Sequence, residues 1–324
     1  MTNLSSLLQA VTQTAQQVGP PGGGPGGHGG PGGPPPGFSY TDAFMELIRF
    51  VGFFLAIGAI GFRYGIVRRV RGMSDEARTT LGADNAALIG ILGVLLLVLN
   101  ALGAPYLTAI ADNKTFAEAL PKNLNPLEFK LVMLALAFIG FALVRAMPKF
   151  GWNLARIGVV LAVLQPLYTG RNLSGKVNAV HIFAASTWLG TLLVLTLVGI
   201  HGMIKRPATG SQRAQLVADL VNSFSPLALT AATIVAITGA TTAWLHLKRI
   251  SALWTSSYGI ALMVKLVLVL TVVVLGAWNW KRVRPSLGTE GTEHTIRRSA
   301  TMELTFAALV LLATSVLVTL PSPR

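Results

Sequence analysis

Cysteine is absent from this chain of 324 residues, which excludes disulfides, thiolate metal sites and iron–sulfur clusters held by cysteine. Charge is scarce too, because Asp, Glu, Lys and Arg make up 12% of the residues, whereas a soluble globular chain carries about 25%. The motifs GxxxxGK[ST], GxSxG and HExxH are also missing, which argues against ATP-driven pumping by this chain alone and against an enzyme of those classes. We therefore expect an integral membrane protein that is not an enzyme.

Apolar residues are abundant, at 52%. From residue 42 onward they form eight runs that are long enough, or nearly so, to cross a membrane as helices, which takes about 20 residues each. The expected spans are 42–66, 86–111, 127–147, 151–169, 177–202, 219–247, 257–280 and 298–320. The fourth is short and contains Asn153, Arg156, Gln165 and Pro166, so it is the weakest. The predicted fold class is all-α, a polytopic membrane bundle of eight transmembrane helices.

The first 41 residues differ in composition from the rest. Residues 1–18 contain no charged side chain and repeat leucine and valine at helical spacing, which predicts a short amphipathic helix. Residues 19–37 are all glycine or proline except His28, which predicts a flexible linker. The expected organisation is a tail at 1–41, a four-span region at 42–175 and a second four-span region at 176–324.

The net charge of +14 is concentrated in alternate loops between the expected spans. The first, third, fifth and seventh loops hold fifteen lysines and arginines, and the other side holds seven. The positive-inside rule places the fifteen in the cytoplasm and both termini outside. Because topology and anionic lipid at the inner leaflet account for the basic residues, the expected partner is membrane lipid and not nucleic acid.

Polar side chains inside the expected spans gather at two depths. Ionisable groups in a membrane are costly and mark candidate functional sites. The outer group comprises His181, His246, Met45 and Glu46. The inner group comprises His201, Met203 and Glu303. Imidazole with thioether suits Cu(I), and imidazole with carboxylate suits Cu(II) or Zn(II), so the two groups are candidate metal sites at opposite ends of a path.

Each of these residues also has an ordinary structural interpretation. Glu46 and Arg49 are three residues apart on one helical face and can neutralise each other. Methionines fill cores, and a histidine at a helix end can lie in the interface without binding a metal. Arg49 and Lys265 oppose a cation path if they line it. The carboxylate of Glu303 can serve helix packing through a hydrogen bond, with Asn279 or Arg298 as its candidate partner.

Short motifs in the second half resemble a known family. Residues 181–190, HIFAASTWLG, are similar to the H-x-x-A-A-x-x-W-x-G signature of the copper resistance protein D family. The family's order continues with Phe224–Ser225, Thr238–Gly239, Tyr258–Gly259, Lys265, Asn279 and Glu303. The resemblance covers residues 176–320 and implies a bacterial inner-membrane protein of eight spans that handles copper. His181, Trp188, Asn279 and Glu303 match the family pattern, whereas His246, Met45 and Glu46 are candidates from depth alone.

Three functions remain open from the sequence. The leading hypothesis is a copper permease that receives the ion at the outer group and releases it at the inner group, from periplasm to cytoplasm. The second is a membrane electron carrier in which His181 and His246 are the axial ligands of a b-type haem. The third is a scaffold whose tail recruits a periplasmic copper-binding protein.

Overall fold

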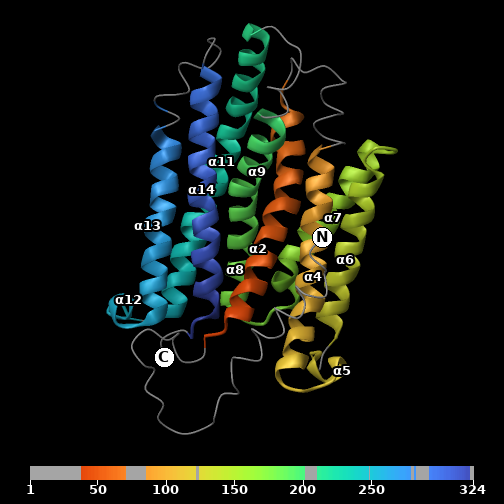
Figure 1. Cartoon of the computed structure of the whole chain (residues 1–324), viewed down its shortest axis with the longest axis vertical. Helices are drawn as coiled ribbons and strands as arrows, with labels where there is room; N and C mark the ends of the chain where they lie inside the picture. The colour runs from red at the N-terminus through yellow and green to blue at the C-terminus, as the bar shows by residue number, and fades with distance from the viewer. Residues whose placement is uncertain are drawn as a thin grey trace, which may run out of the picture. The chain divides into compact units, whose positions relative to one another are not determined.

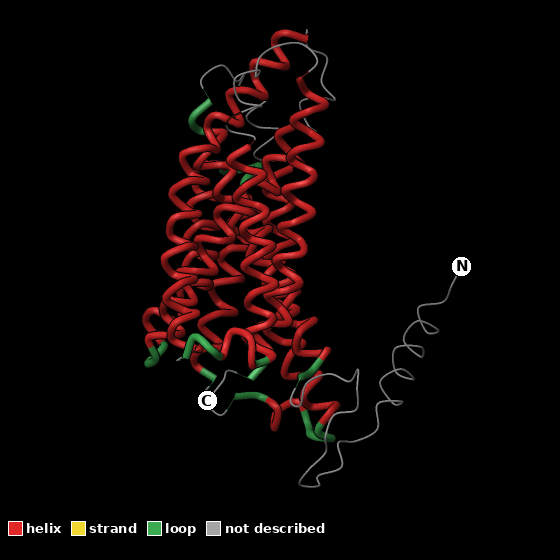
Figure 2. Tube along the Cα trace, turned by 90° about the vertical axis from the view of Figure 1, so that its left-hand side faces the viewer, coloured by secondary structure: helices red, strands yellow, loops and turns green. Residues whose placement is uncertain are grey.

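The computed structural model describes residues 38–70, 85–121, 124–200, 210–247, 249–278, 281 and 292–321. All regular structure in these residues is helical, without a strand (Figures 1 and 2). Seven of the described helical segments are long and apolar enough to cross a membrane. The all-α membrane bundle expected from the sequence is thereby confirmed.

The seven candidate spans follow the predicted order. They are α2 with η1 (Tyr40–Gly61 and Phe62–Val67), α4 (Ala87–Ala111), α6 (Asn125–Leu143), α8 to η4, α11 (Gly210–Leu247), α13 (Ser257–Trp278) and α14 (Thr292–Thr319). The segment from α8 to η4 consists of α8 (Leu173–Ala185), η3 (Ser186–Gly190), α9 (Thr191–Val194) and η4 (Leu195–Ile200). Two short helices, α5 (Phe116–Ala119) and α12 (Ala252–Thr255), lie at the end of the bundle where α2 begins (Figure 1).

The fourth expected span is present as helix α7 (Pro148–Thr169), which packs along α6. Pro148 stands at its first turn, where a proline costs no hydrogen bond. The helix is not one of the seven apolar candidates, because polar residues such as Lys149, Asn153 and Arg156 lower its hydropathy. The eighth crossing and the placement of both termini therefore remain predictions.

Close helix packing in this bundle depends on glycine. At Gly140 of α6, a Cβ atom would lie 2.2 Å from the backbone nitrogen of Ala155 in α7. At Gly58 of α2, it would lie 2.3 Å from the carbonyl oxygen of Gly190 in η3. Small residues allow such backbone approach between helices in a membrane, where van der Waals packing replaces the hydrophobic effect.

Helix α2 is the element that joins the two predicted four-span regions. It packs against α4 and α7 on one side and against η3, α9 and α14 on others. Phe62, at the start of η1, is completely buried, as is Leu97 of α4. On the outer surface, by contrast, α13 exposes 64% of Val267 and 62% of Leu270. When apolar side chains of a long helix are exposed to this extent, lipid hydrocarbon covers them in the membrane.

Candidate metal site

The seam between α8 and α11 holds both histidines whose side chains the structure describes. His181 of α8 faces α11, with its Nδ1 atom 3.0 Å from the Thr238 hydroxyl. His246 of α11 faces α8, with its Nε2 atom 3.4 Å from the Ser174 hydroxyl. Each of the two helices thus directs one imidazole toward a hydroxyl group of the other helix.

The hydrogen bonds of Thr238 determine which nitrogen of His181 carries the proton. The Thr238 hydroxyl donates to the carbonyl oxygen of Ile234 at 2.6 Å, so toward His181 it can only accept. Nδ1 of His181 is therefore the N–H donor, and Nε2 carries the lone pair. A neutral imidazole in this tautomer is ready to bind a metal through Nε2.

His246 has the same tautomer for a similar reason. Its Nδ1 atom lies 2.8 Å from the carbonyl oxygen of Thr242, and a carbonyl oxygen can only accept. Nε2 therefore carries the lone pair, toward which the Ser174 hydroxyl points. The Tyr258 ring stacks on the imidazole with centroids 5.9 Å apart. Metal-binding histidines are commonly oriented in this way, by donating the other ring N–H to a backbone carbonyl.

The two histidines lie at different depths, which corrects the expectation that they share one. Ser174, the partner of His246, stands seven residues before His181 on α8. Seven residues of α-helix rise about 10 Å, so His246 is two turns nearer the end where α8 begins. Two nitrogens bound to one metal ion lie about 4 Å apart. A shared copper ion and a haem held by both side chains are therefore incompatible with this geometry.

The surroundings of His181 combine close packing with a positive charge. A Cβ atom at Gly239 would lie 3.1 Å from Cε1 of the imidazole, so the glycine makes room for the ring. The half-buried Lys265 of α13 is close enough to interact electrostatically with His181. Trp188 packs against two buried apolar clusters and is a packing residue in this structure.

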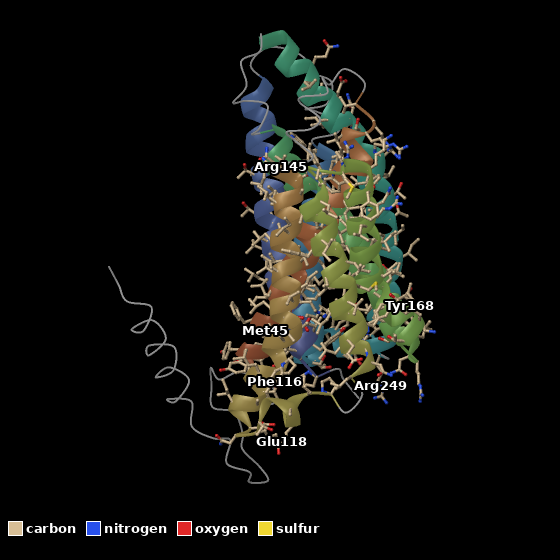
Figure 3. The ribbon with its side chains drawn as sticks, turned by 90° about the vertical axis from the view of Figure 1, so that its right-hand side faces the viewer. Met45, Phe116, Glu118, Arg145, Tyr168 and Arg249 are labelled. Carbon is tan, nitrogen blue, oxygen red and sulfur yellow. The ribbon has the colours of Figure 1, made fainter. Side chains whose placement is uncertain are left out.

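Met45 and Glu46 are directed toward other helices. Met45 is buried, and its side chain packs against Gly103 of α4. Glu46 forms an ion pair with Arg49 on its own helix. Figure 3 shows Met45 toward the end of the bundle that contains Phe116 and Glu118, with Arg145 toward the other end. The outer group predicted from depth is thus not assembled around His181. The orientation of α2 about its own axis directs Met45 toward α4, and Glu46 bonds along α2 to Arg49.

The inner group is described only in part. Glu303 of α14 is buried, with 9% of its surface exposed. Ala307 and Val310, one and two turns further along α14, pack with Leu189 of η3, so Glu303 lies beyond them in the direction of η4. His201, Met203 and Asn279 lie outside the described residues, and their proposed role stays a prediction.

Span 5 contains two buried hydroxyls that sequence reasoning overlooked. Ser186 and Thr191 are completely buried at the two ends of η3, and within the described chain neither hydroxyl has a hydrogen-bond partner. Thr196 donates instead to the carbonyl four residues earlier, at 2.8 Å. The π-helical turn η3 lies between these two hydroxyls, and such turns are frequent at functional sites.

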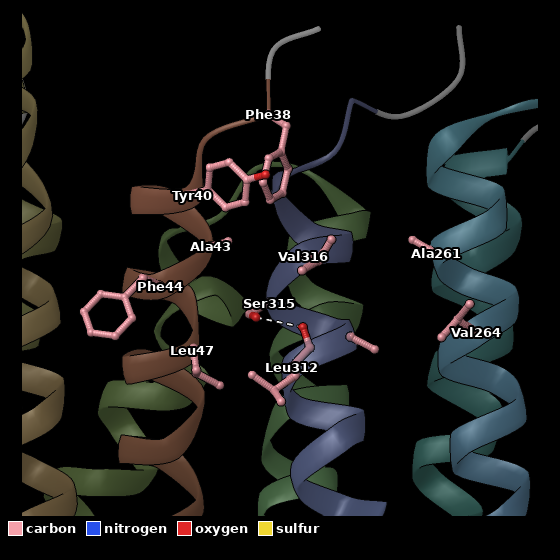
Figure 4. A pocket seen from close by; sticks show the side chains of 11 residues that line it. Phe38, Tyr40, Ala43, Phe44, Leu47, Ala261, Val264, Leu312, Ser315 and Val316 are labelled. Atoms are coloured by element: carbon pink, nitrogen blue, oxygen red, sulfur yellow. Dashed lines mark hydrogen bonds between the residues drawn. The ribbon is translucent and has the colours of Figure 1, made fainter. Parts of the chain in front are cut away.

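A groove of about 520 Å³ between α2, α13 and α14 offers no metal ligand (Figure 4). Its walls include Phe38, Tyr40, Phe44 and Val264. The hydroxyl of Ser315 in it donates to the carbonyl oxygen of Leu312 at 2.8 Å. Across the residues with described positions, no three His, Asp or Glu side chains form a group that could hold a metal ion. Within the described part of the chain, His181 is therefore not joined by two further histidine or acidic side chains.

The arrangement is that of a multi-pass membrane protein with two histidines, two turns apart, in the seam between α8 and α11. Comparison with known proteins connects it to copper. Residues 218–317 match the family model described as Copper resistance protein D. The match extends from α11 to α14 and confirms the resemblance over that region. The motif at 181–190 precedes the matched residues.

Among characterised proteins, this chain is similar to the Copper transport protein CutJ of Bacillus subtilis (strain 168). The two are 27% identical over 200 residues, which is 59% of this chain and 35% of that protein. The chain thus matches about a third of the relative's length. No solved structure matches this chain.

Proposed function

We propose that this protein transports copper across the bacterial inner membrane and that His181 binds the ion on the way. The observation that carries the proposal is the pair of imidazoles in the α8–α11 seam, each held with Nδ1 as donor and Nε2 as the lone-pair nitrogen. Imidazole nitrogen is a ligand for copper in either common oxidation state.

The route begins at His246, two turns nearer the end of the bundle than His181. An ion bound at His246 passes between α8 and α11 to His181. His201, Met203 and Glu303 receive it in the other half of the membrane, and the direction is from periplasm to cytoplasm. Sites with few ligands suit transport, because an ion has to leave each site as well as enter it.

The copper resistance protein D match and the copper transport protein among the relatives support a transporter in preference to an enzyme. The depth difference between His181 and His246 speaks against the haem-carrying alternative. A periplasmic copper-binding protein that delivers the ion, with the tail at 1–41 as its docking segment, is a further part of this proposal.

The test compares wild type with His181→Ala and with His28→Ala as a matched control, because His28 lies in the Gly/Pro-rich linker. Each protein is purified in detergent and analysed for bound copper and for its absorption spectrum, and copper flux is measured in liposomes. We expect flux and copper binding to be lost in His181→Ala and retained in His28→Ala. A haem Soret band that disappears in His181→Ala would overturn the proposal, as would unchanged flux.

A further inference from the structure

The first half of helix α7 carries a polar face that the metal route does not use. Lys149, Asn153 and Arg156 are spaced i, i+4 and i+7, so they share one side of the helix, and all three are exposed. The opposite side of the helix, which contains Gly151 and Ala155, packs against α6. The polar face of α7 therefore points out of the bundle.

The polar face adjoins an apolar surface of the same helix. Phe150 and Ile157 expose 54% and 48% of their surfaces, as side chains covered by lipid do. Arg156 stands eight residues after Pro148, which is about 12 Å along the helix. Helical side chains lean toward the N-terminus of their helix. Lys149 and Arg156 therefore extend toward the end of the bundle where α7 begins, at which long basic side chains reach lipid headgroups.

A tyrosine from the neighbouring η1 segment holds Arg156 in place. The guanidinium carbon lies 4.9 Å from the centroid of the Tyr64 ring. The Tyr64 hydroxyl donates to Oδ1 of Asn153 at 3.0 Å, which leaves the amide NH2 group of Asn153 as a donor. One ring thus orients two side chains of the polar face. A guanidinium already positioned over an aromatic ring loses less conformational freedom when it binds a ligand.

The positive charge of the polar face has no counter-charge among the residues that the structure describes. The ion pairs there are Arg49–Glu46 and Lys114–Asp112, and neither includes a residue of this face. A charge that faces lipid is costly without a counter-charge. Planar guanidinium groups bind phosphate oxygens through paired hydrogen bonds, and clustered basic residues next to a membrane helix attract anionic lipids.

We propose that the polar face of α7, together with Tyr64, binds the headgroup of an anionic phospholipid. The guanidinium of Arg156 donates paired hydrogen bonds to the phosphate oxygens, and Lys149 adds a second positive charge two turns nearer the end of the bundle. The acyl chains lie along Phe150 and Ile157. A free phosphate ion would gain nothing from these apolar neighbours, so the surface fits a lipid.

The experiment uses the full-length protein in detergent after removal of lipid. Native mass spectrometry measures the binding of phosphatidylglycerol, which is anionic, and of phosphatidylcholine, which is zwitterionic. We expect Arg156→Gln to weaken phosphatidylglycerol binding about tenfold, the loss expected for hydrogen bonds to a charged group. Arg171→Gln is the charge-matched control, because Arg171 is exposed just beyond the other end of α7, and it should bind as wild type does.

Thermal unfolding separates loss of lipid binding from damage to the fold. Without lipid, wild type and Arg156→Gln should unfold at closely similar temperatures, because the Arg156 side chain is exposed. A ligand that binds the folded state raises the unfolding midpoint. Phosphatidylglycerol should therefore raise the midpoint of wild type and of Arg171→Gln by more than that of Arg156→Gln.

Three results would overturn the proposal. The first is equal binding of phosphatidylglycerol by wild type and Arg156→Gln, or an equal loss in Arg171→Gln, which would reflect total charge alone. The second is binding of phosphatidylcholine as tight as that of phosphatidylglycerol. The third is Arg156-dependent binding of inorganic phosphate, measured by phosphorus NMR, that is as tight as lipid binding, which would assign the surface to the free ion.

Discussion

At the scale of single residues, Thr238 determines the state of His181. Because its hydroxyl donates to Ile234 and accepts from Nδ1, it keeps Nε2 free for a metal. We expect Thr238→Val to lower copper affinity about 10- to 100-fold, as removal of a metal ligand's hydrogen-bond partner does. Thr238→Ser should retain the affinity. Copper titration and nitrogen NMR of the imidazole check this, and wild-type affinity with an unchanged tautomer in Thr238→Val would show that the hydroxyl has no such role.

The distance between His181 and His246 leads to a second prediction at this scale. Sites more than about 7–10 Å apart without shared partners act additively, and these two imidazoles are about 10 Å apart along the helices. His246→Ala should therefore slow copper flux while His181 still binds copper at equilibrium. The effects of the single variants on copper affinity should add in the double variant. Loss of all copper binding in His246→Ala would instead mean that both side chains hold one ion.

At the scale of helices, glycine contacts set the packing. Gly58→Ala brings a methyl group to 2.3 Å from the Gly190 carbonyl oxygen, and backbone cannot yield as a flexible side chain does. Overpacking of this kind costs about 1–3 kcal/mol. Gly276→Ala is the control, because nothing lies within 4 Å of its Cβ position in α13. Thermal unfolding in detergent should show a lower midpoint for Gly58→Ala, and equal midpoints would contradict the close contact.

The short loop helix α5 offers a prediction about pH. Hydrogen bonds from the backbone N–H and the side chain of Thr115 hold the pKa of Glu118 below its usual 4.5. A carboxyl with a lowered pKa stabilises the folded loop above its ordinary pKa, and the contribution disappears as the pH falls through the lowered value. The protection of the α5 amides against hydrogen exchange, relative to the intrinsic exchange rate at each pH, should therefore fall on acidification below the ordinary pKa of 4.5, and it should lose this dependence in Glu118→Gln.

At the scale of the whole molecule, α7 decides the topology. If α7 crosses the membrane, the chain has eight spans and both termini lie on one side, whereas seven spans put them on opposite sides. The absence of cysteine makes the test direct, because Ser6→Cys and Ser322→Cys each introduce a single thiol. We expect a membrane-impermeant thiol reagent to label both variants from outside the cell. Labelling of only one of them would mean that α7 does not cross.

Much of this protein follows from its sequence. A helix has to satisfy its backbone hydrogen bonds internally in lipid, so each long apolar run predicts a helix, and the observed bounds, such as Ser257–Trp278 for 257–280, agree closely. The lack of cysteine limits the metal ligands to histidine, methionine and carboxylates. The sequence identified His181 and Glu303 as candidates for two reasons. An ionisable side chain inside a membrane span is energetically costly, and both residues match the pattern of the copper family.

The tertiary structure decided which of these side chains meet. A membrane helix is apolar on the side that faces lipid and on the side that faces protein, so its sequence shows only a weak apolar periodicity. The sequence therefore does not specify how the helix is rotated about its axis. Backbone contacts at residues such as Gly58 and Gly140 set that rotation. They turn Met45 toward α4, and the offset between α8 and α11 separates His181 from His246 by two turns. Depth in the membrane was readable from the sequence, but the direction of each side chain required the packed bundle.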